Sequence, residues 1–256
     1  MARSPMSMTV ALLLLITDAA AERATVSADG QMAGGRFTDQ LAAGVGPLWS
    51  SVVEHKFTDE LAAGTMDKDI LRCYLIQDHR FLDAFVVLLS SMIANARSLA
   101  DRIPGAQFLA LITGKENTYF ERSFEALGVT AAQRETTPNA TATSGFIELM
   151  RDAARSGSLG EMLAVLVVAE WSYATWGERV LPVAVSGPFY YREWVDLHSG
   201  EYFTSVVEYL RTLLDREAGL IDADERKRVT ARFAAASKFE KQFFDTCYDN
   251  PPVMAA

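Results

Sequence analysis

One carboxylate interrupts the most apolar stretch of the chain. Glu170 follows residues 163–169, a run that contains only Leu, Val and Ala, and Tyr173 and Trp176 come after it at steps of three. On a helix, Glu170, Tyr173 and Gly177 share one face. An acid on such a face either titrates abnormally or forms a specific hydrogen bond. Glu170 is therefore the first candidate for a reacting group. The alternative is a buried acid that a neighbouring Tyr or Arg satisfies.

Two further acids stand among aromatic residues at helical spacing. Asp78 has Tyr74, Phe81 and Phe85 on its face, and Glu240 lies among Phe239, Phe243 and Phe244. If Asp78, Glu170 and Glu240 converge, they form a pocket for a flat, nitrogen-rich ring, because aromatics stack on its faces and carboxylates accept hydrogen bonds from its amino groups. Taken singly, each acid has a simpler explanation as a surface residue at a helix boundary, the commoner place for Asp and Glu.

Other kinds of site find little support in the sequence. The three histidines, His55, His79 and His198, do not occur in a Glu-x-x-His or His-x-x-x-His pattern. Glycine-rich phosphate loops and the Gly-x-Ser-x-Gly nucleophile turn are absent from the sequence. We therefore predict no metal and no cofactor. Cys73 and Cys247 form no Cys-x-x-Cys pair, so we expect two reduced thiols in the core, with one disulfide as the alternative.

The elements that would position these residues are all helices. Half of the 256 residues are hydrophobic, no linker divides the chain, and period-two strand patterns are absent. We predict a single all-α domain of about eight or nine helices, with Pro104 as a break between two of them. The segments with helical periodicity are residues 37–55, 67–89, 107–127, 142–155, 159–180, 190–198, 201–217 and 222–248.

Charge and the N-terminal segment bear on partners and compartment. The net charge of −9 argues against nucleic acid as a partner, because a basic stripe is expected there. Residues 9–16 are apolar and residues 19–21 are Ala-Ala-Ala, which is typical of a secretory signal; the run is too short to span a bilayer. We predict that residues 1–31 are either this signal or a spurious upstream extension, and that the domain occupies residues 32–250.

The two acidic aromatic segments carry a family resemblance. Residues 77–82 (QDHRFL) resemble the Gln-Asp-x-x-Tyr/Phe-Leu motif of the TenA/thiaminase II family, whose members have the haem-oxygenase-like all-α fold. Residues 237–248 (SKFEKQFFDTCY) resemble its C-terminal Ser-x-Tyr-Glu-x-x-Phe-Trp/Phe motif. Connecting landmarks follow in the expected order at residues 48–49, 55–57, 61–65 and 194–195.

The chain departs from the better-known branch of that family at the catalytic position. That branch has a Cys two residues before the Trp of the apolar helix, where this chain has Ala169 followed by Glu170. The arrangement is similar to a second branch with Glu in place of the Cys. Two further departures are Phe146 and His198, where Tyr is usual. A thiol nucleophile is therefore not expected, and water takes its place.

The resemblance implies hydrolysis of aminopyrimidine or formylaminopyrimidine breakdown products of thiamine, with release of ammonia or formate. Glu170 and Glu240 would share acid and base work, and Tyr173 would steady the departing group. Asp78 would hold the amino group and a nitrogen of the ring. The remaining substrate-binding residues would be Phe81, Phe146, His198 and Phe243.

The resemblance also implies a homotetramer in the cytoplasm without stable membrane association; export is the alternative if residues 1–21 are a signal peptide. Two other functions compete with hydrolysis. One is a pyrimidine-binding protein that lost turnover with the Cys. The other is an oxygen-dependent oxidoreductase or metal enzyme on the same fold, which the missing Glu-x-x-His argues against.

Overall fold

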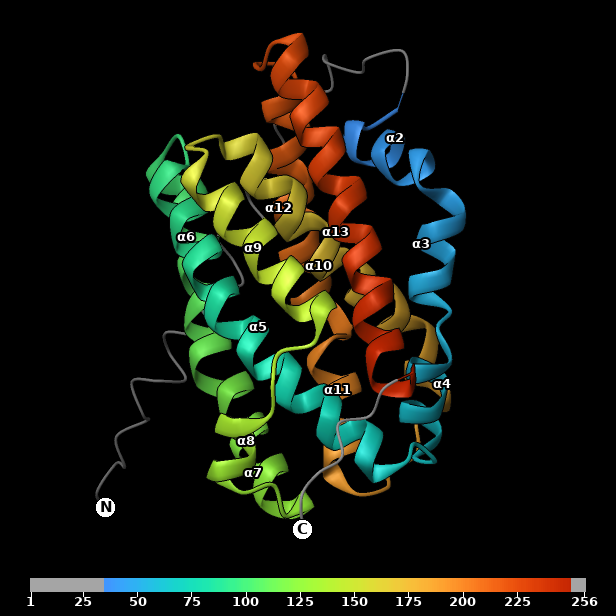
Figure 1. Cartoon of the computed structure of the whole chain (residues 1–256). Helices are drawn as coiled ribbons and strands as arrows, with labels where there is room; N and C mark the ends of the chain where they lie inside the picture. The colour runs from blue at the N-terminus through green and yellow to red at the C-terminus, as the bar shows by residue number, and fades with distance from the viewer. Residues whose placement is uncertain (1–34, 250–256) are drawn as a thin grey trace, which may run out of the picture. The chain divides into compact units, whose positions relative to one another are not determined.

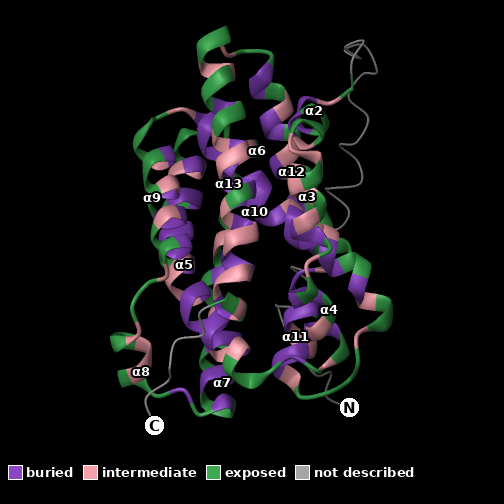
Figure 2. Ribbon diagram, turned by 45° about the vertical axis from the view of Figure 1, so that its right-hand side comes forward, coloured by how far each residue is buried: buried purple, intermediate pink, exposed green. Residues whose placement is uncertain are grey.

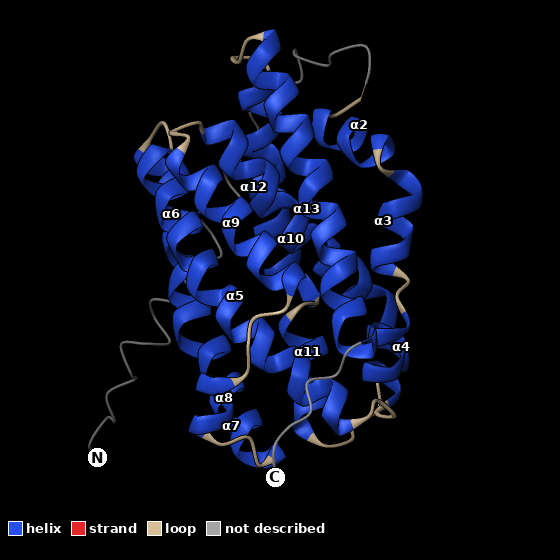
Figure 3. Ribbon diagram, in the orientation of Figure 1, coloured by secondary structure: helices blue, strands red, loops and turns tan. Residues whose placement is uncertain are grey.

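The computed structural model describes residues 35–249, and all regular structure in that range is helical (Figures 1 and 3). The prediction of an all-α domain is therefore confirmed. A compact unit begins at Phe37. Residues 1–31, for which a signal or an upstream extension is predicted, lie outside the described residues. Within residues 35–249, no helix is both long enough and apolar enough to cross a bilayer.

The described part of the chain contains twelve α-helices, one π-helical turn and one 3₁₀ turn. In chain order they are α2 (Phe37–Gly44), α3 (Gly46–Val53), α4 (Lys56–Ala63), α5 (Lys68–Asn95), α6 (Leu99–Leu111), the π-turn η1 (Ile112–Glu116), α7 (Asn117–Leu127), α8 (Ala131–Thr136), α9 (Thr141–Arg155), α10 (Leu159–Val180), the 3₁₀ turn η2 (Leu181–Val183), α11 (Phe189–Leu197), α12 (Gly200–Ala218) and α13 (Ala223–Asp249).

Helix α10 lies at the centre of the bundle. Of its 22 residues, 18 are buried, and it packs against α5, α9, α12 and α13 (Figure 2). A helix that is apolar on all sides has to be surrounded in this way, because no face of it favours water. The Ser158 hydroxyl accepts from the backbone N–H of Glu161 and caps its first turn. Glu170, which is predicted to react, thus lies on a helix that is buried along most of its length.

Helices α5 and α13, with 28 and 27 residues, run along α10 and contact each other. The Asp67 carboxylate caps α5 by accepting from the backbone N–H of Asp69 at 2.7 Å. Cys73 on α5 is joined to Cys247 on α13 by a disulfide, with 5.8 Å between the two Cα atoms. The expectation of two reduced core thiols was therefore wrong, although both residues are buried. Sequence spacing could not reveal that two positions 174 residues apart face each other.

The structure contains more helices than the eight or nine predicted, for local reasons. The helix predicted for residues 37–55 divides at Val45, where Gly44 ends α2 and Gly46-Pro47 begins α3. Glycine weakens a helix interior, and Pro fits best in a first turn. Conversely, Pro104 does not break the chain but lies inside α6. It falls in the second turn, where it removes one backbone hydrogen bond.

Candidate active site

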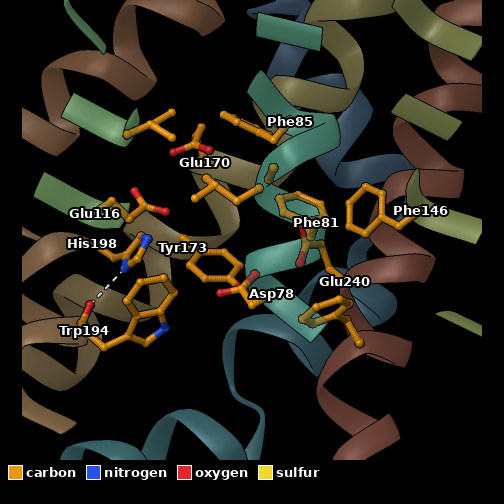
Figure 4. Close-up of a pocket in the computed structure, with 14 residues that line it drawn as sticks. Asp78, Phe81, Phe85, Glu116, Phe146, Glu170, Tyr173, Trp194, His198 and Glu240 are labelled. Atoms are coloured by element: carbon orange, nitrogen blue, oxygen red, sulfur yellow. Dashed lines mark hydrogen bonds between the residues drawn. The ribbon is translucent and has the colours of Figure 1, made fainter. Parts of the chain in front are cut away.

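One pocket between α5, α10 and α13 collects every residue predicted for the site. The residues predicted for catalysis and for substrate binding that line it are Asp78, Phe81, Phe146, Glu170, Tyr173, His198, Glu240 and Phe243 (Figure 4). The predicted convergence of three helices on one pocket is therefore correct, while the role of each residue stays a prediction.

Helix α5 contributes Asp78 and Phe81 to the pocket. The neighbouring Gln77 points the other way, toward the segment before α9. Its side-chain amide donates to the carbonyl of Pro138 at 3.0 Å, and its oxygen accepts from the hydroxyl of Thr143 at 2.7 Å. The two polar residues of the segment thus have different tasks: Gln77 holds the start of α9, and Asp78 faces the pocket.

Helix α10 contributes Glu170 and Tyr173. The hydroxyl groups of Tyr173 and Tyr74 lie 2.7 Å apart in a buried hydrogen bond between α10 and α5. Ala169, the position of the catalytic Cys in the better-known branch, also lines the pocket. Neither cysteine does, and Cys73 lines a separate surface cavity.

Three phenylalanines from three helices form one wall of the pocket. The Phe81 ring lies 4.9 Å from the ring of Phe146 on α9 and 6.0 Å from that of Phe243 on α13, and both pairs meet edge to face. A planar heteroaromatic ring can stack against such a surface.

The acids of the pocket differ from other buried acids in lacking a cation. Glu161 on α10 forms salt bridges with Arg228 and Arg232 at 2.8 and 2.6 Å, and Glu217 on α12 forms one with Arg97. Glu161 is therefore a buried acid satisfied by Arg. Glu170, for which the same arrangement is the alternative interpretation, has no Arg beside it in the pocket. None of the described residues that line the pocket is Lys or Arg. A buried carboxyl group without a cation either holds a proton or binds a donor, which a ligand can supply.

The pocket raises the pKa values of its acids. Burial raises the pKa of Asp78 to about 7. Burial, reinforced by the negative charge of Asp78, also raises the pKa of Glu240 well above its ordinary value, and one oxygen of Glu240 has no hydrogen-bond partner. Burial is again the main cause of the strongly raised pKa of Glu170, followed by the charge of Glu116. At neutral pH such a site can hold protonated and ionised carboxyl groups together, as acid and base catalysis requires.

His198 lines the same pocket in its neutral form. It is 5% exposed, and its Nδ1 lies 2.9 Å from the carbonyl oxygen of Trp194. A carbonyl only accepts, so Nδ1 carries the proton and Nε2 is left as an acceptor. Burial lowers the pKa of His198 to about 4.

Sequence analysis missed one acid of the pocket, Glu116. It is the last residue of the π-turn η1 and lines the pocket next to Ile112. Burial, with the charge of Asp78, raises its pKa to about 8. The signal was present: Glu116 follows Ile112 by four residues and precedes Tyr119 and Phe120, the same pattern of an acid among apolar residues that identified Glu170.

Metal-binding geometry is not found in the described residues: no three His, Cys, Asp or Glu side chains from residues 35–249 converge closely enough to hold a metal ion. The groups that line the pocket are carboxyl groups, the hydroxyl of Tyr173, a neutral imidazole and aromatic faces.

Helical arrangement and pocket together define an all-α protein with the haem-oxygenase-like fold and a buried acidic, aromatic site. A domain of unknown function from Shewanella denitrificans, described as having a heme oxygenase-like fold, superposes with a TM-score of 0.61 at 13% identity, covering 86% of this chain and 97% of that one. A TenA homologue from Pyrococcus furiosus superposes with a TM-score of 0.74 at 23% identity, covering 83% and 100%.

The family follows from the sequence comparison. The profile of the TENA/THI-4/PQQC family matches residues 43–250, and the chain belongs to that family. An aminopyrimidine aminohydrolase from Halalkalibacterium halodurans is 24% identical over 205 residues, which cover 79% of this chain and 91% of the relative. The resemblance drawn from the two acidic aromatic segments is thereby confirmed.

Proposed function

We propose that the protein is a hydrolase that cleaves a C–N bond of an aminopyrimidine in the salvage of thiamine breakdown products. The observation that carries the proposal is the set of buried carboxyl groups in the pocket that have no Lys or Arg partner beside a wall of phenylalanines. An aminopyrimidine supplies what this set lacks, because it is flat and donates hydrogen bonds from its amino groups. The relative from Halalkalibacterium halodurans is named an aminopyrimidine aminohydrolase, which supports the same substrate class.

The proposed reaction replaces an amine by a hydroxyl group. Water attacks the methylene carbon that carries the amine, the C–N bond breaks with its electrons going to nitrogen, and the products are a hydroxymethylpyrimidine and ammonium. Glu240 and Glu170 divide the proton transfers, one taking a proton from the water and the other facing the leaving nitrogen. Asp78 holds the ring amine, and Tyr173 is steadied by its bond to Tyr74.

Water is the proposed nucleophile because the pocket offers no thiol. Ala169 stands at the position of the thiol in the better-known branch, and the described cysteines are paired with each other outside the pocket. For a formylated substrate, the same groups would direct water to the formyl carbon and release formate.

One observation favours a second candidate function, a pyrimidine-binding protein without turnover. The methyl group of Ala169 cannot attack a substrate. Incubation of the protein with 4-amino-5-aminomethyl-2-methylpyrimidine, or with its N-formyl derivative, separates the two functions. Ammonia or formate release above that of a Glu170→Gln, Glu240→Gln double variant supports the hydrolase. A ligand-induced rise in melting temperature with no product supports the binding protein.

Oligomeric state and compartment belong to the same proposal. We propose a homotetramer by analogy with the family, which light scattering of the purified protein tests directly. A cytoplasmic location is the family expectation, but the Cys73–Cys247 bond favours the exported alternative, because disulfides persist mainly in oxidising compartments. Cell fractionation decides: a mature protein cleaved near Ala21 outside the cytoplasm supports export, whereas an intact cytoplasmic chain with two free thiols supports the family expectation.

A further inference from the structure

One end of the pocket gathers two carboxyl groups and an imidazole nitrogen, with no Lys or Arg among the described residues that line it. In Figure 4 the labelled side chains of Glu116, Glu170 and His198 point into the same end, whereas Glu240 points in beside Phe81. Glu116 is the charged group that most strongly raises the pKa of Glu170, which places the two carboxyl groups within electrostatic reach. The neutral His198 adds the lone pair of Nε2, because its Nδ1 donates to Trp194.

These acceptors have no protein donor of their own. Neither the carboxyl group of Glu116 nor that of Glu170 accepts a hydrogen bond from a side chain or backbone group among residues 35–249, and Glu170 is only 9% exposed. Glu116 is a partly exposed residue as a whole, but its carboxyl group faces the pocket. It is placed there by a π-turn inserted between α6 and α7, an uncommon local structure that occurs mostly at functional sites.

We propose that Glu116, Glu170 and His198 form an ammonium subsite, which receives the charged aminomethyl group of the substrate while Asp78 holds the ring amine. The inference rests on the proposed function and narrows its substrate. A primary ammonium group brings three N–H donors and a positive charge, and that charge favours the ionised, accepting form of the two carboxyl groups. A hydroxymethyl group brings one donor and no charge. A formamide also lacks the charge and would place its carbonyl oxygen, an acceptor, among acceptors.

The subsite gives Glu116 a role distinct from that of Asp78. Loss of Glu116 should affect ligands that carry the ammonium group and spare those that do not, whereas loss of Asp78 should weaken both because both contain the ring amine. This selectivity separates a binding residue from one that merely supports the fold.

Calorimetry with two matched ligands tests the subsite, 4-amino-5-aminomethyl-2-methylpyrimidine and its 5-hydroxymethyl counterpart. We expect the wild type to prefer the aminomethyl ligand by about 10- to 150-fold, the range for one charge-assisted hydrogen bond. Glu116→Gln should remove most of this preference and leave the affinity for the hydroxymethyl ligand within about twofold. The matched control is Glu125→Gln, which removes the same charge from an exposed position of α7.

The outcomes separate this subsite from the proposed function. Equal binding of both pyrimidines to the wild type, or an equal loss for both in Glu116→Gln, overturns the subsite and leaves the proposed function standing. If neither pyrimidine binds, the proposed function fails, and benzylamine against benzyl alcohol then tests the subsite alone: a Glu116-dependent preference for the amine supports it, and no preference overturns it. The comparison on the wild type needs no variant, so it decides even if Glu116→Gln does not fold.

Discussion

A methyl group at Gly177 would lie 2.0 Å from the carbonyl oxygen of His198, so α10 and the residue that follows α11 touch at a point where no side chain fits. The obstacle is backbone, which cannot rotate away as a flexible side chain would. Because His198 is one of the acceptors of the pocket, this contact links the packing of α10 to the geometry of the site.

Gly177→Ala should therefore weaken both the fold and the site. Overpacking costs about 1–3 kcal/mol of unfolding free energy. The better helix propensity of Ala returns only up to about 1 kcal/mol. Urea unfolding and pyrimidine calorimetry measure the two effects. Gly44→Ala is the control, because a methyl group there meets nothing within 4 Å. A Gly177→Ala protein as stable as the control would show that α11 moves aside freely.

Asp78→Asn should lower pyrimidine affinity by about 1.5–3 kcal/mol, because it removes a charge-assisted acceptor that has no substitute on the wall of phenylalanines. Calorimetry on the folded variant measures the change. Unaltered affinity would remove Asp78 from the site and would leave its burial without a functional explanation.

Turnover should depend on carboxyl groups and not on thiols. Glu170→Gln and Glu240→Gln should each reduce kcat by about 10² to 10⁴, the worth of a positioned acid or base. The double variant should be little worse than either, because groups that act as a unit are not additive. Activity should survive reduction of the disulfide followed by thiol alkylation of the folded protein. A Glu170→Gln enzyme with wild-type turnover that alkylation abolishes would contradict a water nucleophile.

The disulfide should be a large contributor to stability. Closing a loop across 174 residues of sequence stabilises the fold by about 5 kcal/mol in the chain-entropy account. The Cys73→Ser, Cys247→Ser double variant should lose stability of that order in urea unfolding, and reducing agent should lower the wild type to match it. The kcat of the folded double variant should be unchanged. Two titratable thiols in the native protein would mean that the bond does not form.

Stability should fall as pH rises from about 6.5, above which His198 is neutral in both the folded and the unfolded state, to about 8. Unfolding returns Asp78 and Glu116 to their ordinary pKa values, whereas burial holds them at about 7 and about 8 in the folded protein. The folded state thus binds more protons in this window, and each fully titrating acid costs about 1.4 kcal/mol per pH unit. His198, whose pKa is about 4 in the folded protein, contributes to the pH dependence of stability only at lower pH. Melting curves at a series of pH values should show this fall in stability, and Glu116→Gln should make it smaller. An unchanged pH dependence in the variant would mean that a group other than Glu116 titrates.

Sequence alone identifies a site residue when the pattern that marks it lies within one short segment. Glu170 and Asp78 were found because a carboxylate on an apolar helical face is visible within one window of sequence. Their convergence with Glu240 was a prediction about tertiary structure, and it held because each acid lies on the buried face of its own helix. Glu116 carries the same local signal in a less apolar segment, between Lys115 and Asn117.

Other features lie beyond what local patterns contain. The Cys73–Cys247 pairing depends on how α5 and α13 are placed, which no window of sequence records. Pro104 was predicted as a break because Pro disfavours helices on average, yet Ser98 caps α6 and places Pro104 early enough for the helix to continue. The π-turn at residues 112–116 leaves no periodic signature in so short a segment.

The acids of the pocket are distributed along almost the whole described chain: Asp78 and Glu240 stand 162 positions apart, since 240 − 78 = 162. During synthesis, α13 leaves the ribosome after every other described helix. A nascent chain without α13 therefore lacks the side of the pocket that Glu240 and Phe243 form. Proteins truncated by premature termination or by proteolysis before residue 240 would lack both that side and Cys247. The complete set of acids in the pocket therefore exists only in chains whose synthesis has passed residue 240.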